Sequence, residues 1–197
     1  MQKTKIAIDN DDTLLDFNEA VRLFHNANYD TNYQSIDVKE FALEKVWGCD
    51  FDEAFRRISE FWQTEYFNNM QPVSGAFEAV KVLKEKYDLF VLTARPEEVA
   101  IETKLAIKKH FPDLFTDVHF APAFGAGQRK TKVEVCKELG IEVIIDDGIH
   151  NLELCAKEGI KCFMFERPWN MQHSKTELEE KGIIRVKNWT EVLQQLT

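Results

Sequence analysis

The sequence predicts an α/β fold built around a mostly parallel sheet. Short apolar runs alternate along the chain with segments whose apolar residues recur at helical spacing, and this pattern is typical of strands joined by crossover helices. Two of the helical segments stop at Gly140 and Gly159, and glycine is favoured where a helix ends. The chain of 197 residues, 44% of them hydrophobic, is long enough to bury one sizeable core and a small additional unit.

Six apolar runs are expected to form the strands. In chain order they span residues 5–8 (KIAI), 88–93 (DLFVLT), 117–121 (DVHFA), 142–146 (EVIID), 161–165 (KCFMF) and 183–186 (IIRV). Four helices are expected between them, at residues 75–87, 96–111, 132–140 and 151–159. Parallel neighbouring strands need crossover connections of this length, so most of the sheet is expected to be parallel.

Residues 17–71 interrupt the alternation, because no strand pattern occurs among them. Three amphipathic helices are predicted there, at residues 17–27, 37–47 and 50–62, the last of which begins with Asp50 and Glu53 at the spacing of a capping box. We therefore expect an α/β core formed by residues 1–16 and 72–197, with residues 17–71 inserted as a small helical cap.

Composition excludes several classes of partner. A formal net charge of -9 argues against binding a nucleic-acid polymer, which usually requires a basic patch. No apolar run reaches membrane-spanning length and the N-terminus lacks the apolar core of a signal peptide. The four cysteines form no C-x-x-C pair, which favours reduced thiols. We expect a cytoplasmic protein with no membrane partner, and the sequence leaves the oligomeric state open, with a dimer as one option.

Polar residues follow three of the predicted strands. Asp9 and Asp11 follow the first, Thr93 ends the second, and the pair Asp146 and Asp147 ends the fourth. Each alone is compatible with a turn or a helix cap. Together they indicate a site, since ligands of open α/β sheets bind outside the carboxyl ends of the strands.

This set of residues suits phosphoryl transfer. Asp9 can attack phosphorus and form an aspartyl phosphate. Mg²⁺ held by Asp9, the backbone carbonyl of Asp11 and the late aspartates Asp146 and Asp147 would screen the repulsion between carboxylate and phosphate. Asp11, two residues after the nucleophile, can protonate the leaving alcohol and then accept a proton from the hydrolytic water.

A hydroxyl and an ammonium complete the expected phosphate site. Thr93 can donate a hydrogen bond to the transferring group, and Lys132 or Lys130 can supply a positive charge to it. Lys132 is favoured because it stands directly at the start of the helix expected at residues 132–140.

The order of these residues resembles the four motifs of the haloacid dehalogenase superfamily of aspartate-nucleophile phosphatases. Within that superfamily the chain is similar to the 5′-nucleotidase and deoxyribonucleotidase group, and the similarity covers essentially the whole core. The resemblance implies a Rossmann-like three-layer core, a helical cap and Mg²⁺. The segments that carry it are DNDDTLLDF at residues 9–17, LTARP at 92–96, KVEVCKELGIEVIIDD at 132–147 and FERPWN at 165–170.

The resemblance also implies roles for individual residues. Asp9 becomes the nucleophile and Asp11 the acid/base, Thr93 and Lys132 bind phosphate, Asp147 and Asp146 bind the metal, and Phe17 stacks on a nucleobase. The chain departs from the family pattern at Asp12, where the family usually has glycine, and at Asn10, where it often has an apolar residue. Asp12 is expected either to cap the following helix or to add negative charge to the site.

Further substrate contacts are expected near these motifs. Ala94 and Arg95 directly follow Thr93, and a guanidinium such as that of Arg95 or Arg129 suits an oxyanion or the polar edge of a base. Trp47 of the inserted segment is a candidate for the pocket wall, as are Phe51 and Trp62. The RPWN sequence at residues 167–170 either lines the same edge or packs its tryptophan on the core.

The sequence therefore predicts a Mg²⁺-dependent phosphomonoesterase acting on nucleoside monophosphates, with deoxyribonucleotides among them. Two alternatives stay open: the same chemistry on a sugar phosphate or another small phosphomonoester, and a signalling module that accepts phosphate without turnover. The base and sugar preference cannot be read from the sequence.

Overall fold

The computed structural model describes residues 3–122 and 130–197 of the chain and contains one six-stranded sheet. All five pairings between neighbouring strands are parallel, so the predicted fold class is confirmed. Each strand lies within one residue of its predicted range. The strands are β1 (Lys5–Ile8), β2 (Asp88–Thr93), β3 (Asp117–Phe120), β4 (Val143–Asp146), β5 (Lys161–Phe165) and β6 (Ile183–Val186).

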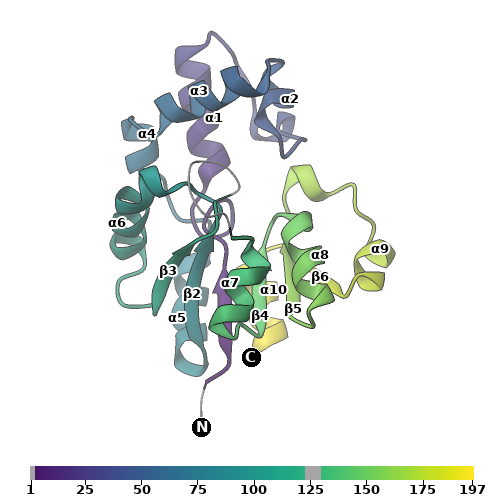
Figure 1. The fold of residues 1–197 in the computed structure, drawn as a ribbon. Helices are drawn as coiled ribbons and strands as arrows, with labels where there is room; N and C mark the ends of the chain where they lie inside the picture. Colours follow the sequence, from purple (N-terminus) through teal and green to yellow (C-terminus); the bar gives the residue numbers. More distant parts are fainter. Residues whose placement is uncertain (1–2, 123–129) are drawn as a thin grey trace.

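The strand order β3-β2-β1-β4-β5-β6 places the first strand at the centre of the sheet (Figure 1). The chain moves from β1 outward to β3 and then crosses to the other side of β1 to begin β4. Ile8 at the end of β1 is paired with Val91 of β2 and with Ile145 of β4. The two connections that leave β1 and β4 therefore diverge at a topological switch point, where open α/β sheets bind ligands.

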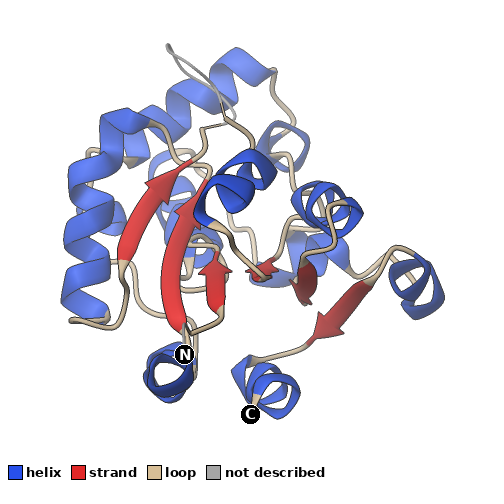
Figure 2. Ribbon diagram, turned by 60° about the horizontal axis from the view of Figure 1, so that its bottom comes forward, coloured by secondary structure: helices blue, strands red, loops and turns tan. Residues whose placement is uncertain are grey.

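Helices cover both faces of the sheet (Figure 2), because the strands are apolar on both sides. Ile6 and Ile8 of β1 pack in one buried cluster and Ala7 between them packs in the other, as expected for side chains that alternate along a strand. The first cluster includes residues of α5 (Ala76–Lys86), α6 (Ala100–His110) and α10 (Trp189–Leu196). The second includes residues of α7 (Lys132–Leu139), α8 (Ile149–Lys157) and α9 (Lys175–Glu180).

The start of α7 is fixed by its own sequence. The Thr131 hydroxyl accepts a hydrogen bond from the backbone N–H of Glu134, and the Glu134 carboxylate accepts one from the backbone N–H of Thr131. This capping box makes Lys132 the first residue of the helix. At the other end Gly140 adopts a φ of 67°, which confirms the predicted stop, because this left-handed conformation favours glycine.

The inserted segment contains more, and shorter, helices than the sequence predicts. Two predicted helices are present as α1 (Phe17–Asn28) and α3 (Phe51–Phe61). The helix predicted at 37–47 is wrong over its first half, since only α2 (Leu43–Trp47) forms. Asp37 instead closes a short 3₁₀ turn (η1, Ser35–Asp37) by accepting a hydrogen bond from the backbone N–H of Gln34. An additional helix, α4 (Glu65–Asn68), was not predicted.

These helices lie beyond the carboxyl ends of the strands (Figure 1), and aromatic residues hold them to the sheet core. Phe61 is fully buried, with its ring centroid 5.6 Å from that of Phe24 and 5.5 Å from that of Phe67. All three belong to the same buried cluster as Ile6 and Ile8. The apolar core therefore extends without interruption from the sheet into the inserted helices.

Two further features bear on the class of protein. In the described part of the chain, no helix is both long and apolar enough to cross a membrane. All four cysteines lie in that part and are free thiols, three of them buried.

A buried histidine ties α1 to α2 and α3. His25 is 1% exposed and stacks on Trp47 and Tyr29, with ring centroids 4.4 Å and 4.8 Å away. Its Nε2 atom accepts a hydrogen bond from Arg57 Nη1 at 2.9 Å, and its Nδ1 atom lies 2.9 Å from Thr31 Oγ1. A guanidinium can only donate, so the imidazole is neutral. Burial and the charge of Arg57 lower the pKa of His25 to about 4.

Acid is therefore expected to destabilise the protein through His25. The unfolded chain binds the proton near pH 6.5 and the folded protein only near pH 4, so the stability that the neutral ring contributes is complete above pH 6.5 and is lost between those values. The free energy of unfolding should fall by about 1 to 3 kcal/mol across this range, as measured by urea denaturation. His25→Gln lacks this titration, and an equal pH dependence in both proteins would contradict the assignment.

Candidate active site

The carboxyl ends of two neighbouring strands, β1 and β4, bring the predicted acidic residues together. Asp9 follows β1, Asp146 ends β4, and Asp147 comes directly after it. All three are buried, with 5%, 1% and 5% of their surface exposed. Oxygen atoms from the three carboxylates lie within 4.8 Å of one another, so residues separated by more than 130 positions form one cluster.

Lys132 enters this cluster from the first turn of α7. Its Nζ atom lies 2.5 Å from Asp9 Oδ1 and 2.7 Å from Asp146 Oδ2, and its side chain is 4% exposed. The neighbouring Lys130 turns to the surface, where it pairs with Glu138 at 2.7 Å. The structure thus brings the favoured one of the two candidate lysines to Asp9.

The cluster carries more negative than positive charge. Three carboxylates face one ammonium, which leaves two negative charges without a partner of opposite sign. Burial raises the pKa of Asp9 and of Asp147 well above the usual range, and the charge of Asp146 raises both further. A hard divalent cation fits such a set, because Mg²⁺ prefers carboxylate oxygens and two positive charges would balance the cluster. The predicted fourth ligand, the backbone carbonyl of Asp11, stays a prediction.

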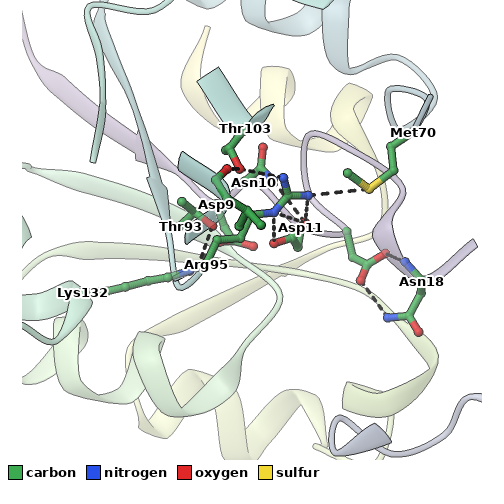
Figure 3. A network of polar contacts seen from close by, with 11 residues as sticks. Asp9, Asn10, Asp11, Asn18, Met70, Thr93, Arg95, Thr103 and Lys132 are labelled. Atoms are coloured by element: carbon green, nitrogen blue, oxygen red, sulfur yellow. Dashed lines mark hydrogen bonds and ion pairs between the residues drawn. The ribbon is translucent and has the colours of Figure 1, made fainter. Parts of the chain in front are cut away.

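The side chain of Asp11 is turned away from this cluster toward Arg95 (Figure 3). Arg95 Nε donates to Asp11 Oδ2 at 2.9 Å and Nη2 donates to Oδ1 at 2.6 Å. The remaining contacts of the guanidinium are with Thr103 Oγ1 at 2.9 Å, the sulfur of Met70 at 3.6 Å and the ring of Phe67 at 4.8 Å. Arg95 lines the cavity but is 5% exposed, and each of its three guanidinium nitrogens donates to a protein partner, so the expected contact with substrate stays a prediction.

Thr93 lies at the end of β2, fully buried, where its Oγ1 atom accepts a hydrogen bond from the backbone N–H of Arg95 at 3.1 Å. The hydroxyl proton is still available for donation, since the hydroxyl acts as acceptor in that bond. Ala94 and Arg95 line the cavity between the acidic cluster and the inserted helices, whereas Thr93 is not among its lining residues.

Both departures from the family pattern lie in the loop after β1. Asp12 has a φ of 58°, in the left-handed region that favours the glycine usual at this position. Its carboxylate accepts hydrogen bonds from the backbone N–H and the side-chain amide of Asn18, in the first turn of α1. Burial raises the pKa of Asp12 to about 7, against the lowering effect of these bonds. Asp12 thus both holds the helix start and adds acidic character to the site. Asn10 is fully buried and donates to Asp11 Oδ1 at 3.1 Å.

A cavity of about 360 Å³ lies between the acidic cluster and the inserted helices. Its floor includes Asp9, Asp147 and Lys132, whereas its opposite wall is largely apolar. Phe17 contributes to that wall at the start of α1 and packs edge-on against Phe61 with centroids 5.6 Å apart. The other apolar residues of the wall come from α3, from the residue directly after it and from the segment before it: Phe41, Ala42, Leu43, Phe51, Ala54, Phe55, Ile58 and Trp62.

The prediction for Trp47 differs from the structure. Trp47 does not line the cavity, because the short helix α2 directs its ring onto His25. Phe51 and Trp62, the other two candidates for the wall, do line it. Arg129 lies outside the described residues.

Some residues that hold the site together could not be recognised from the sequence. Thr103 fixes Arg95, and Asn18 fixes Asp12. Both are polar residues inside helical patterns, where a surface position is the usual expectation. Trp169 donates from its indole N–H to Asp147 Oδ2 at 2.7 Å. From the RPWN sequence, Trp169 was expected either to line the same edge of the sheet or to pack on the core, and the sequence did not decide between the two.

Comparison with known proteins agrees with this geometry. Residues 3–197 match the sequence family described as 5′ nucleotidase, deoxy (pyrimidine), cytosolic type C protein. The chain is 28% identical over 199 residues to the 5′(3′)-deoxyribonucleotidase of Bacillus subtilis strain 168, covering 98% of this chain and 99% of that protein, and equally to the protein of that name in Bacillus phage SPbeta.

Solved structures share the fold. A haloacid dehalogenase-like hydrolase from Streptococcus pneumoniae superposes with a TM-score of 0.71 at 15% identity, over 99% of both chains. A haloacid dehalogenase-type hydrolase from Bacillus subtilis, whose structure was determined bound to magnesium, superposes with a TM-score of 0.64 at 17% identity, over 100% of both chains. The match along almost the entire length of the chain shows that it belongs to the 5′ nucleotidase, deoxy (pyrimidine), cytosolic type C family, and that it is a phosphoric monoester hydrolase with a haloacid dehalogenase-like fold.

Proposed function

We propose that the protein is a Mg²⁺-dependent phosphomonoesterase that hydrolyses nucleoside monophosphates, deoxyribonucleotides among them, through an aspartyl-phosphate intermediate. The observation that carries the proposal is the carboxylate cluster of Asp9, Asp146 and Asp147 with Lys132 on the floor of an aromatic-walled cavity. We further propose that residues 17–71 act as the cap of the catalytic core. The free thiols support a reducing location such as the cytoplasm.

Asp9 is the proposed nucleophile. Lys132 engages its Oδ1 atom, and no donor among the described residues is hydrogen-bonded to Oδ2, which is the atom left for attack. As the bond from Oδ2 to phosphorus forms, the bond from phosphorus to the alcohol oxygen breaks. We propose that Lys132 stabilises the charge that builds up on the phosphoryl oxygens and that the Thr93 hydroxyl, which is fully buried in this structure, donates to one of them when substrate is bound.

Asp11 is the proposed acid/base. Its side chain is 26% exposed, against 6% for that of Asp9, so it is the more accessible of the two to a leaving group and to water. It gives a proton to the departing alcohol oxygen and takes one from the water that then attacks phosphorus, which releases inorganic phosphate and restores Asp9. Arg95 is proposed to orient Asp11 rather than to bind substrate, because two of its nitrogens engage that carboxylate.

The metal would be held by Asp9, Asp146 and Asp147, with the carbonyl of Asp11 as a further ligand. When bound, the cation favours the ionised form of the carboxylates and draws in the phosphate oxygens. The apolar wall of the cavity supports a substrate with one charged end and one flat end, and the relatives named deoxyribonucleotidase support a nucleotide. A sugar phosphate, the main alternative, would leave this aromatic wall without a flat partner.

Asp9→Asn is expected to lower phosphate release by about 10⁴-fold or more, because the amide keeps the shape of the carboxylate but is not a nucleophile. The fold should persist, since Lys132 keeps its bond to Asp146. Phosphate release from deoxyribonucleoside monophosphates with Mg²⁺ measures the effect, and circular dichroism checks the fold. Normal turnover by this variant would refute the covalent mechanism, and lasting phosphorylation of the wild-type protein without turnover would favour a signalling module.

Removal of divalent cations with EDTA should abolish hydrolysis, and added Mg²⁺ should restore it, because burial and mutual repulsion disfavour the charged form of Asp9 and Asp147. The measurement is the rate of phosphate release during a Mg²⁺ titration of the metal-free protein. Full activity after exhaustive chelation would contradict the metal assignment.

Phe17→Ala is expected to raise the KM for nucleoside monophosphates about tenfold, since base–aromatic stacking contributes about 1–3 kcal/mol. The KM for p-nitrophenyl phosphate should change much less. Phe77→Ala in α5, an aromatic substitution outside the cavity, serves as the control. Equal effects of Phe17→Ala on both substrates would exclude stacking.

A further inference from the structure

The segment after β5 contacts two loops of the candidate site. Arg167 Nε donates to the backbone carbonyl of Asp12 at 2.7 Å, in the loop after β1. Trp169 and Asn170, in the 3₁₀ turn η3 (Pro168–Asn170), contact Asp147 in the loop after β4. A single short segment therefore connects the loops that carry the proposed nucleophile and the proposed metal ligand.

The contacts with Asp147 are short and buried. Trp169 Nε1 donates to Asp147 Oδ2 at 2.7 Å, and Asn170 Nδ2 donates to the Asp147 backbone carbonyl at 3.0 Å. Trp169 is 6% exposed and Asn170 1%. The two side chains thus fix both the backbone and the carboxylate of the same residue.

Asp147 differs from Asp9 and Asp146 in the group that contacts its carboxylate. Asp9 and Asp146 share the ammonium of Lys132, whereas no cation of the described residues forms an ion pair with Asp147. Its hydrogen-bond donor is the neutral indole of Trp169. An indole N–H donates only and does not ionise at neutral pH, so it occupies Oδ2 while Oδ1 is left for another ligand.

The segment that presents the indole is itself anchored. Asn170 Nδ2 also donates to the Phe165 carbonyl at 2.9 Å, and Arg185 Nη2 donates to the Asn170 carbonyl at 3.2 Å. Arg185 is held in turn by an ion pair with Glu166 at 3.3 Å. These bonds hold the turn between β5 and α9 in place, so the position of the indole is set before any ligand arrives.

We propose that Trp169 is a positioning residue for the metal site, which orients the Asp147 carboxylate so that Oδ1 is presented to the cation. This inference rests on the proposed function, in which Asp147 binds Mg²⁺. Partners that orient a ligand typically change metal affinity by about 10- to 100-fold. Trp169→Phe keeps an aromatic ring but removes the N–H, so it should weaken cation binding by about tenfold or more.

A matched control exists in the same chain. Trp189 is also buried, at 1% exposure, and its indole N–H also donates to an oxygen, the backbone carbonyl of Thr13, at 3.1 Å. Trp189→Phe removes the same atoms and one hydrogen bond but leaves Asp147 untouched. Binding of Mn²⁺ in place of Mg²⁺ is followed by the electron paramagnetic resonance signal of the free ion, which needs no turnover.

The expected result is weaker Mn²⁺ binding by Trp169→Phe and unchanged binding by Trp189→Phe. Wild-type affinity in a folded Trp169→Phe protein would overturn this inference alone. Failure of the wild-type protein to bind Mn²⁺ would overturn the metal proposal as well, so the two failures are distinguishable.

A measurement on the wild-type protein covers the case in which Trp169→Phe does not fold. The four tryptophans give separate indole N–H signals in ¹⁵N-labelled protein, and Phe variants of the other three identify that of Trp169 by elimination. This signal should move during a Mg²⁺ titration and saturate with the binding curve, while that of Trp189 stays in place. A Trp169 signal that does not respond to bound Mg²⁺ would overturn the inference.

Discussion

The structure depends on how the buried charges at the end of the central strand are accommodated. Removing a carboxylate from water costs several kcal/mol unless it is paired or hydrogen-bonded, and here three of them meet at one edge of the sheet. Lys132 forms ion pairs with two of them, although its single positive charge balances only one negative charge, and it is in reach because a capping box fixes the start of α7 at that residue. The third carboxylate, that of Asp147, accepts a hydrogen bond from the indole of Trp169, while Asn170 holds the backbone carbonyl of the same residue. The carboxylate cluster therefore depends on the capping box of α7, on the strand order that makes β1 and β4 neighbours, and on the turn after β5.

The loop after β1 is also the mechanical link between the sheet and the inserted helices. Asp12 bonds the first turn of α1 through Asn18. Arg95, which follows β2, donates hydrogen bonds to Asp11. It also contacts Met70 and the ring of Phe67, at the end of the inserted segment. Movement of the helices relative to the sheet would therefore act directly on the residues proposed for catalysis. The polar floor and the apolar wall of the cavity belong to these two linked parts.

Asp12 stands where the family usually has glycine, and hydrogen bonds to other segments offset its unfavourable backbone conformation. A φ of 58° is unfavourable for a residue with a side chain, but the same conformation brings the carboxylate to Asn18 and the carbonyl to Arg167. Aspartate tolerates this region better than most residues because its short side chain can hydrogen-bond locally. The bonds from the carboxylate to Asn18 anchor the loop in a way that glycine does not provide, whereas the backbone carbonyl that binds Arg167 is common to both residues.

The sequence by itself determined the six strands, the parallel sheet, most of the covering helices and the set of acidic residues with Lys132, because apolar periodicity, glycine stops and the ends of strands are local features. It missed the break before Leu43 and placed Trp47 in the pocket, since a helical pattern does not reveal which way a short helix turns its side chains. It also did not show that Arg95 bonds Asp11 and contacts Met70, which lie 84 and 25 positions away in the chain. Only the tertiary structure decided such contacts, because burial and hydrogen-bond partners depend on which distant segments the fold brings together.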